Sequence, residues 1–201
     1  MTTAVYANPI KLMVLGDSLS AGHKLKPKEA FYSQLQQVLQ EKGYQINVIN
    51  FSKSGETTAG GVAKLKTALA KKPDAVILEL GINDLRRGLS LAKAEKNLQS
   101  IISTFQDRNI PVLLVGMEAP ALAPQAYRDT FRNMYRSLAN KNHLMLYPFF
   151  MNGLWNNDGT QKDLSYFLQD MAHPSAIGVT IMVQNILPTV EHFLNDNNLG
   201  K

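Results

Sequence analysis

The chain has 201 residues, of which 45% are hydrophobic and 18% are charged, and it carries a formal net charge of +5. This composition is typical of one globular domain, and the scattered lysines and arginines form no arm of the kind that binds nucleic acid. The sequence contains no cysteine, which excludes disulfides, thiolate metal sites and cysteine nucleophiles. No apolar run reaches the roughly 18 residues that a membrane span needs, so we expect no integral membrane segment.

The first nine residues precede the first predicted strand, and we expect a disordered terminus or the remnant of a signal. Val5-Tyr6-Ala7 before Asn8-Pro9 resembles the small-residue end of a secretory signal peptide, although the charged and apolar parts of such a signal are missing. We therefore expect a periplasmic or secreted protein with a trimmed signal, and a cytoplasmic location stays open. A single domain is predicted over residues 10–195, followed by a tail over 196–201.

Apolar runs and helical patterns alternate along the chain. Short apolar runs predict five strands, over residues 10–15, 46–51, 75–80, 111–115 and 143–147. Apolar residues at helical spacing predict helices between them, over residues 31–39, 62–69, 91–105 and 125–140, and a last helix from Ser175 that Pro188 should kink or end. This alternation favours a parallel sheet covered on both faces, in a three-layer α/β/α, flavodoxin-like arrangement. The segment from 149 to 169 is a long loop, which in a compact domain is usually functional or mobile.

Polar loops follow the predicted strands. Gly16-Asp17-Ser18 follows the first strand, residues 52–58 the second, 81–84 the third and 116–120 the fourth, and residues 170–173 precede the last helix. In open parallel sheets, ligands bind outside the carboxyl ends of the strands. We therefore expect these loops to meet at one edge of the sheet and to form the functional site there.

Three residues of these loops supply the parts of a nucleophilic hydrolase. A serine hydroxyl such as that of Ser18 needs a base to take its proton, and His173 can serve as base and then as acid. Asp170, three residues earlier, can orient the imidazole across one turn of chain. Ser18 alone would read as a helix cap, and His173 beside Pro174 could cap the last helix.

Four sequence blocks in order carry a resemblance. They are GDSLSAG around Ser18, SGETTAGG around Gly55, GIND around Asn83 and DMAHP around His173. The chain resembles the SGNH (GDSL) hydrolase family, and within it the small bacterial thioesterases, lysophospholipases and arylesterases. The resemblance implies an α/β/α SGNH fold, a catalytic set of Ser18, Asp170 and His173, and no cofactor.

The resemblance also implies three donors for an oxyanion hole: the backbone N–H groups of Ser18 and Gly55 and the side-chain amide of Asn83. Asn83 could otherwise be a turn residue, since Asn-Asp favours turns. The chain departs from the family pattern at Ile82, where a second glycine is frequent, and at Met171-Ala172. These departures concern the shape of the pocket and hence the substrate.

The other polar residues in and near these blocks receive minor roles. We expect Asp17 to brace its loop and Asp84 to be structural. Glu79 could be a buried acid, but we favour a position at a sheet end with a hydrogen-bond partner. His23 is placed either at the pocket or on the surface, whereas His143 and His192 read as surface residues. No spacing of histidines and carboxylates in the sequence indicates a metal site.

The resemblance and the apolar residues of the loops suggest the substrate. We expect the pocket to be lined by Leu85, Met117, Ala119, Pro120, Phe149, Leu154 and Trp155. Such a pocket suits a small-molecule ester or lipid: acyl or aryl esters, lysophospholipids and acyl thioesters. The alternatives are a carbohydrate acetyl esterase of the same family and a non-catalytic flavodoxin-like binding module.

Overall fold

A computed structural model describes residues 8–156 and 159–200 of the chain. Its sheet consists of five strands, β1 (Ile10–Gly16), β2 (Ile46–Asn50), β3 (Ala75–Glu79), β4 (Val112–Val115) and β5 (Leu146–Tyr147). All neighbouring strands are parallel, in the order β2-β1-β3-β4-β5. The predicted α/β/α fold with a five-stranded parallel sheet is confirmed. The expected signal remnant lies mostly outside the described residues.

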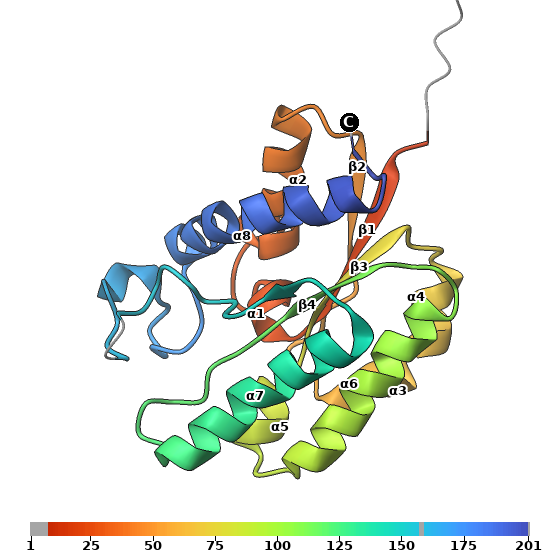
Figure 1. The fold of residues 1–201 in the computed structure, drawn as a ribbon. Helices are drawn as coiled ribbons and strands as arrows, with labels where there is room; N and C mark the ends of the chain where they lie inside the picture. Colours follow the sequence, from red (N-terminus) through yellow and green to blue (C-terminus); the bar gives the residue numbers. More distant parts are fainter. Residues whose placement is uncertain (1–7, 157–158, 201) are drawn as a thin grey trace, which may run out of the picture.

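Helices cover both faces of the sheet. They are α1 (Ser18–Ala21), α2 (Phe31–Glu41), α3 (Thr58–Ala63), α4 (Leu65–Ala70), α5 (Ile82–Arg86), α6 (Leu91–Gln106), α7 (Gln125–Asn142) and α8 (Ala176–Asp196), with 3-10 turns η1 (Pro27–Glu29) and η2 (Leu164–Tyr166). Helices α2 and α8 lie on one side of the sheet, whereas α3, α4, α6 and α7 lie on the other (Figure 1). No helix in the described part of the chain is long and apolar enough to cross a membrane.

The central strands are buried because helices cover them on both faces. Leu12 to Leu15 of β1 and every residue of β3 have no more than traces of exposed surface. This explains why the strands read as continuous apolar runs rather than as alternating ones. The register pairs Gly16 with Glu79, so the loops after β1 and β3 leave the sheet side by side.

The structure differs from the predicted elements in four places. The fifth strand spans only two residues, because α7 continues to Asn142 and His143 then turns the chain with a left-handed φ of 53°. The predicted helix over 62–69 is divided into α3 and α4 at Lys64, and the short helix α5 was not predicted. Pro188 does not end α8, which runs through it to Asp196.

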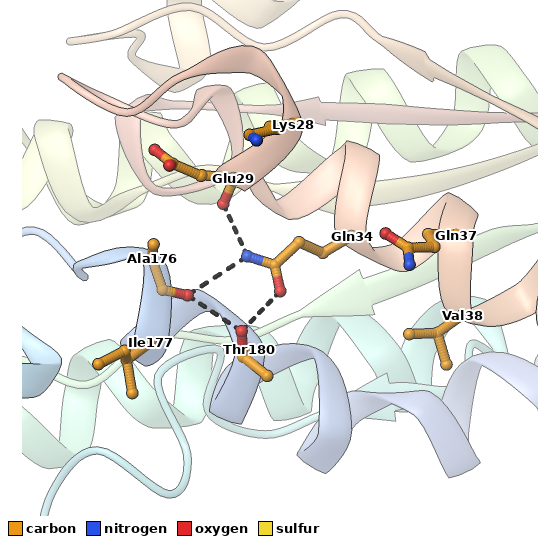
Figure 2. A pocket seen from close by; sticks show the side chains of 8 residues that line it. All are labelled: Lys28, Glu29, Gln34, Gln37, Val38, Ala176, Ile177 and Thr180. Carbon is orange, nitrogen blue, oxygen red and sulfur yellow. Dashed lines mark hydrogen bonds between the residues drawn. The ribbon is translucent and has the colours of Figure 1, made fainter.

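Gln34 of α2 connects this helix to the start of α8. Its amide nitrogen donates to the carbonyl oxygens of Glu29 (2.8 Å) and Ala176 (3.3 Å), and its amide oxygen accepts from the hydroxyl of Thr180 (2.8 Å). A surface hollow of about 440 Å³ surrounds these groups (Figure 2). None of the predicted site residues lines this hollow, but the bonds fix the helix that directly follows His173.

Candidate active site

The loop after β1 places Ser18 at the first residue of α1. Asp17 caps this helix, because its Oδ1 accepts a hydrogen bond from the backbone N–H of Leu19 at 3.0 Å. Gly22 ends the helix after one turn in the left-handed conformation. The side chain of Ser18 is therefore held at the carboxyl edge of the sheet, with only 9% of the residue exposed.

The segment before α8 brings a histidine to this serine. His173 Nε2 lies 2.9 Å from Ser18 Oγ, and His173 Nδ1 lies 2.9 Å from Asp170 Oδ2. Ser18 and His173 are 155 positions apart in the chain, so only the fold joins them. The three predicted catalytic side chains thus form one continuous hydrogen-bonded chain.

Asp170 also shapes the backbone that carries His173. Its Oδ1 accepts from the backbone N–H groups of Ala172 and His173, both at 3.0 Å, around a left-handed Met171. Partial burial raises the pKa of Asp170, but these two N–H donors and the His173 imidazole outweigh it and hold the pKa below its ordinary value. Asp170 is therefore a carboxylate at neutral pH, as a group that orients a histidine must be.

Two backbone N–H groups of the loops after β1 and β2 donate no hydrogen bond within the described residues. Among the described residues, neither Ser18 N nor Gly55 N donates to another group. Gly55 has a φ of +76°, which favours glycine, and Arg87 fixes its peptide by donating to the Gly55 carbonyl at 2.7 Å. These are two of the three predicted oxyanion donors.

The third predicted donor, Asn83, is already hydrogen bonded. Its Nδ2 donates to Asp17 Oδ2 at 2.8 Å and to the Glu56 carbonyl at 3.0 Å. These bonds join the loops after β1, β2 and β3 at one point. A substrate oxygen that receives a bond from Asn83 must share one of these two hydrogens or displace its acceptor.

Two buried acids, Asp17 and Glu79, lie next to the loop that carries Ser18. Glu79 Oε2 accepts from Ser20 Oγ at 2.7 Å and from the Asp17 backbone N–H at 3.2 Å. Gly16 must lack a side chain here, because a Cβ would lie 2.6 Å from Glu79 Oε2. Burial raises the pKa of Asp17 to about 7, and burial together with the neighbouring Asp17 raises the pKa of Glu79 well above its ordinary value. Glu79 thus accepts two hydrogen bonds from the loop that carries the nucleophile, and its burial disfavours the ionised form.

His23 lies directly against His173. The two ring centroids are 4.3 Å apart at an interplanar angle of 38°. Burial and the nearby His173 lower the pKa of His23, which favours its neutral form. Of the two positions considered for His23, the structure places it at the site.

The apolar residues predicted to line the pocket divide into two groups. Leu154 is fully buried, and Met117 and Ala119 are only 3% and 4% exposed, so these three belong to the core. Leu85, Phe149 and Trp155 are half-buried and Pro120 is exposed. Trp155 packs edge-to-face on Phe167 with ring centroids 5.1 Å apart. Of the predicted lining, only Leu85, Pro120, Phe149 and Trp155 therefore keep exposed apolar surface that a ligand could contact.

Sequence reasoning missed several supporting contacts. The bond from Arg87 to the Gly55 carbonyl has no signal in spacing, because it joins loops after different strands. The hydrogen bonds from the N–H and hydroxyl of Thr58 to Asp84 are also long-range contacts. The hydrogen bonds of Glu79, in contrast, were expected from the sequence, because it is the one acid in a buried apolar strand.

Comparisons with known proteins find one matching family model and several similar chains. The model of the GDSL-like lipase/acylhydrolase family matches residues 14–181. The chain is 34% identical over 184 residues to Esterase TesA of Pseudomonas aeruginosa, covering 91% of this chain and 89% of the relative. It is 39% identical over 142 residues to an arylesterase of Vibrio mimicus, covering 70% and 71% of the two chains.

Two further similarities extend this result. Thioesterase 1/protease 1/lysophospholipase L1 of Escherichia coli K12 is 31% identical over 186 residues, with 90% and 85% of the two chains covered. The crystal structure of TesA superimposes with a TM-score of 0.84 at 34% identity, over 92% of this chain and 99% of that one. AlinE4, an SGNH-hydrolase family esterase, gives a TM-score of 0.72 at 37% identity, over 94% and 98%.

Proposed function

Because the chain belongs to the GDSL-like lipase/acylhydrolase family, we propose that Ser18 is its nucleophile, His173 its general base and Asp170 the residue that orients His173. The protein is a serine ester hydrolase, and its relatives are named esterase, arylesterase and thioesterase. One observation carries the assignment of roles: the two 2.9 Å contacts that join Ser18 Oγ, the His173 ring and Asp170 Oδ2.

In the first half of the reaction, Ser18 Oγ attacks the carbonyl carbon of the ester while His173 Nε2 takes the hydroxyl proton. The carbonyl oxygen becomes an oxyanion, which the N–H groups of Ser18 and Gly55 are free to bind, with Asn83 as the proposed third donor. The imidazolium then gives its proton to the leaving oxygen or sulfur as the bond to the acyl carbon breaks. An acyl-enzyme on Ser18 remains.

In the second half, water takes the place of the leaving group. His173 removes a proton from the water as its oxygen attacks the acyl carbon, and it returns that proton to Ser18 Oγ as the acid departs. Asp170 stays ionised throughout, in keeping with its lowered pKa, and stabilises the imidazolium that forms twice per turnover. No cofactor enters either half.

We further propose that the acyl or aryl group of the substrate lies on Leu85, Pro120, Phe149 and Trp155, the members of the predicted lining that keep exposed surface. Each buried methylene contributes roughly 0.8 kcal/mol, so a few carbons decide the preferred chain length. A p-nitrophenyl ester series from acetate to decanoate measures this preference. A preference for acetyl groups on a carbohydrate over this series would favour the acetyl esterase alternative.

The roles of the three residues are tested with Ser18→Ala. Its hydroxyl bonds only to His173 among the described side chains, so we expect the fold to persist while kcat falls on the order of 10⁶-fold, as in a well-studied serine protease. Covalent labelling by a fluorophosphonate, read by mass spectrometry on the peptide with residue 18, should disappear. Ser33→Ala, on α2 outside the site, is the matched control and should label normally. Labelling of the Ser18→Ala variant at another serine would contradict the proposal.

The periplasmic or secreted location is likewise a proposal, and it is supported by the sequence of residues 5–9 alone. Cell fractionation of the native host with an antibody to the protein tests it.

A further inference from the structure

We infer that His23, Asp170 and His173 form an inhibitory site for a divalent transition-metal ion of the zinc class. One ligand atom from each of these residues lies within 4.8 Å of the other two. The inference rests on the proposed role of His173 as the base, since it is the shared residue of both sites. The sequence gives no hint of it, because His23 and Asp170 are on opposite ends of the chain.

The chemistry of the three ligands selects the ion. Imidazole nitrogens suit Zn²⁺, Cu²⁺ and Ni²⁺, whereas Mg²⁺ and Ca²⁺ prefer oxygen ligands. Two histidines and one carboxylate with an open fourth position form a ligand set that zinc accepts in proteins. Water can occupy the fourth position.

The geometry is close to what such an ion needs. Zinc bonds of 2.0–2.2 Å in a tetrahedron separate the ligand atoms by roughly 3.4 Å. Asp170 Oδ2 and His173 Nδ1 are already 2.9 Å apart, and the His23 ring lies against His173 at a centroid distance of 4.3 Å. His23 and His173 are half-buried and Asp170 is exposed, so an ion can enter. The His23 nitrogen has to move closer to the other two ligand atoms for all three to bond the ion.

Binding at this site must stop the reaction, whichever ring nitrogen of His173 the ion takes. At Nδ1 the ion binds the lone pair of the neutral imidazole, whose proton then lies on Nε2, so that Nε2 cannot accept the Ser18 proton. At Nε2 it takes the lone pair that must receive the Ser18 proton. The metal would therefore act as a reversible inhibitor that competes with catalysis and not as a cofactor.

The test uses ZnCl₂ and MgCl₂ with the full chain in a non-chelating buffer. Hydrolysis of p-nitrophenyl butyrate is followed for the wild type, His23→Asn and His192→Asn, each relative to its own metal-free rate. His192 is the matched control, since it also pairs with a carboxylate, Asp196 at 3.3 Å, but is exposed at the far end of α8. Zinc binding is measured in parallel by titration calorimetry on the Ser18→Ala variant with and without His23→Asn.

We expect Zn²⁺ but not Mg²⁺ to inhibit the wild type, with recovery on addition of EDTA. His23→Asn should raise the zinc concentration for half-inhibition by more than about 10-fold. Loss of a group that only hydrogen bonds to a metal ligand already lowers metal affinity by about 10- to 100-fold, and His23 is itself a ligand. His192→Asn should leave it unchanged. Equal half-inhibition in the wild type and His23→Asn, or equal inhibition by Mg²⁺, would overturn the inference.

The calorimetry separates the two proposals. One outcome is that zinc binds to Ser18→Ala, that this binding is lost with His23→Asn, and that the wild type is not labelled at Ser18. This outcome would support the metal site and contradict the roles proposed for catalysis. Normal esterase activity lost in Ser18→Ala, with no zinc binding that depends on His23, would sustain those roles and overturn the metal site.

Discussion

Asp170 contributes to the site through both carboxylate oxygens. Oδ2 holds the His173 ring, while Oδ1 holds the backbone of Ala172 and His173 in the turn that presents this ring. The turn explains how a carboxylate only three residues from the histidine can reach it without a strand of its own. The two functions can be separated by substitution.

Replacing Asp170 by Asn removes the negative charge. The one amide oxygen that remains can accept either from the backbone N–H groups of Ala172 and His173 or from the His173 ring, but not from both sides. We expect kcat to fall about 10⁴-fold, as for the equivalent change in a serine protease, with a smaller change in KM. Steady-state kinetics on a p-nitrophenyl ester measures both. Asp163→Asn is the control, because Asp163 caps the exposed turn η2 in the same segment and should leave kcat unchanged. A loss below tenfold in Asp170→Asn would contradict its orienting role.

Asn83 links the three loops and is the proposed third oxyanion donor. Asn83→Ala should lower kcat about 10²- to 10³-fold with little change in KM, because the donor acts on charge that develops in the transition state. The same change removes the bonds to Asp17 and Glu56, so a thermal unfolding curve is recorded beside the kinetics. Asn140→Ala on the exposed face of α7 is the control. An unchanged kcat in a folded Asn83→Ala variant would show that the two backbone donors suffice.

At the scale of elements, one hydrogen-bonded pair fixes α3 against α5. Asp84 Oδ2 accepts from the Thr58 backbone N–H at 2.8 Å, and Oδ1 accepts from the Thr58 hydroxyl at 2.7 Å. Both residues are nearly fully buried, and Asn97 of α6 donates to the same hydroxyl at 3.0 Å. The start of α3, just after the Gly55 loop, is thereby tied to the helix that carries Asn83.

Asp84→Asn tests this link. The amide of asparagine has one oxygen and one NH₂ group, so the NH₂ group faces either the N–H or the hydroxyl of Thr58 and that hydrogen bond is lost. We therefore expect the free energy of unfolding to fall by about 1–3 kcal/mol. Urea denaturation followed by circular dichroism measures it. Asp107→Asn at the exposed end of α6 should change stability by less than about 0.5 kcal/mol. Equal stability of the two variants would mean that the link is energetically neutral.

The helices and strands also show which sequence patterns predict secondary structure reliably. The long helices α2, α6, α7 and α8 were predicted because their apolar residues recur at helical spacing against a buried sheet. The extent of the fifth strand was overestimated, because residues 143–145 are apolar enough for a strand but His143 closes α7 in a left-handed turn. Pro188 lies within α8, where burial of the flanking residues Ile186, Leu187 and Val190 outweighs the loss of one backbone hydrogen bond.

At the scale of the whole molecule, the buried acids Asp17 and Glu79 make stability depend on pH. Burial raises the pKa of both in the folded chain, to about 7 for Asp17. In the unfolded chain they ionise at their ordinary values, 3.8 and 4.5. Between pH 4 and 7 the unfolded state therefore binds fewer protons than the folded one, and the free energy of unfolding falls as the pH rises.

Glu79→Gln should make this fall shallower, since glutamine does not ionise in either state. One proton bound only in the folded state changes the free energy of unfolding by about 1.4 kcal/mol per pH unit. We expect the slopes of the wild type and of Glu79→Gln to differ by a fraction of this value. Urea denaturation at a series of pH values from 4.5 to 7.5 measures it. Glu41→Gln, exposed on α2, should keep the wild-type slope. A Glu79→Gln variant with the wild-type slope would contradict a raised pKa of Glu79 in the folded chain.

By itself, the sequence determined the order of strands and helices, the parallel α/β/α class and the edge at which Ser18, Gly55 and Asn83 meet. Such features follow from local periodicity and from the polar loops after apolar runs, which neighbouring residues in the chain encode. Only the tertiary structure decided the contacts between loops: His23 on His173, Arg87 on Gly55, and Asn83 committed to Asp17 and Glu56. These contacts join residues from different loops, and their distances depend on how the whole sheet and its covering helices pack.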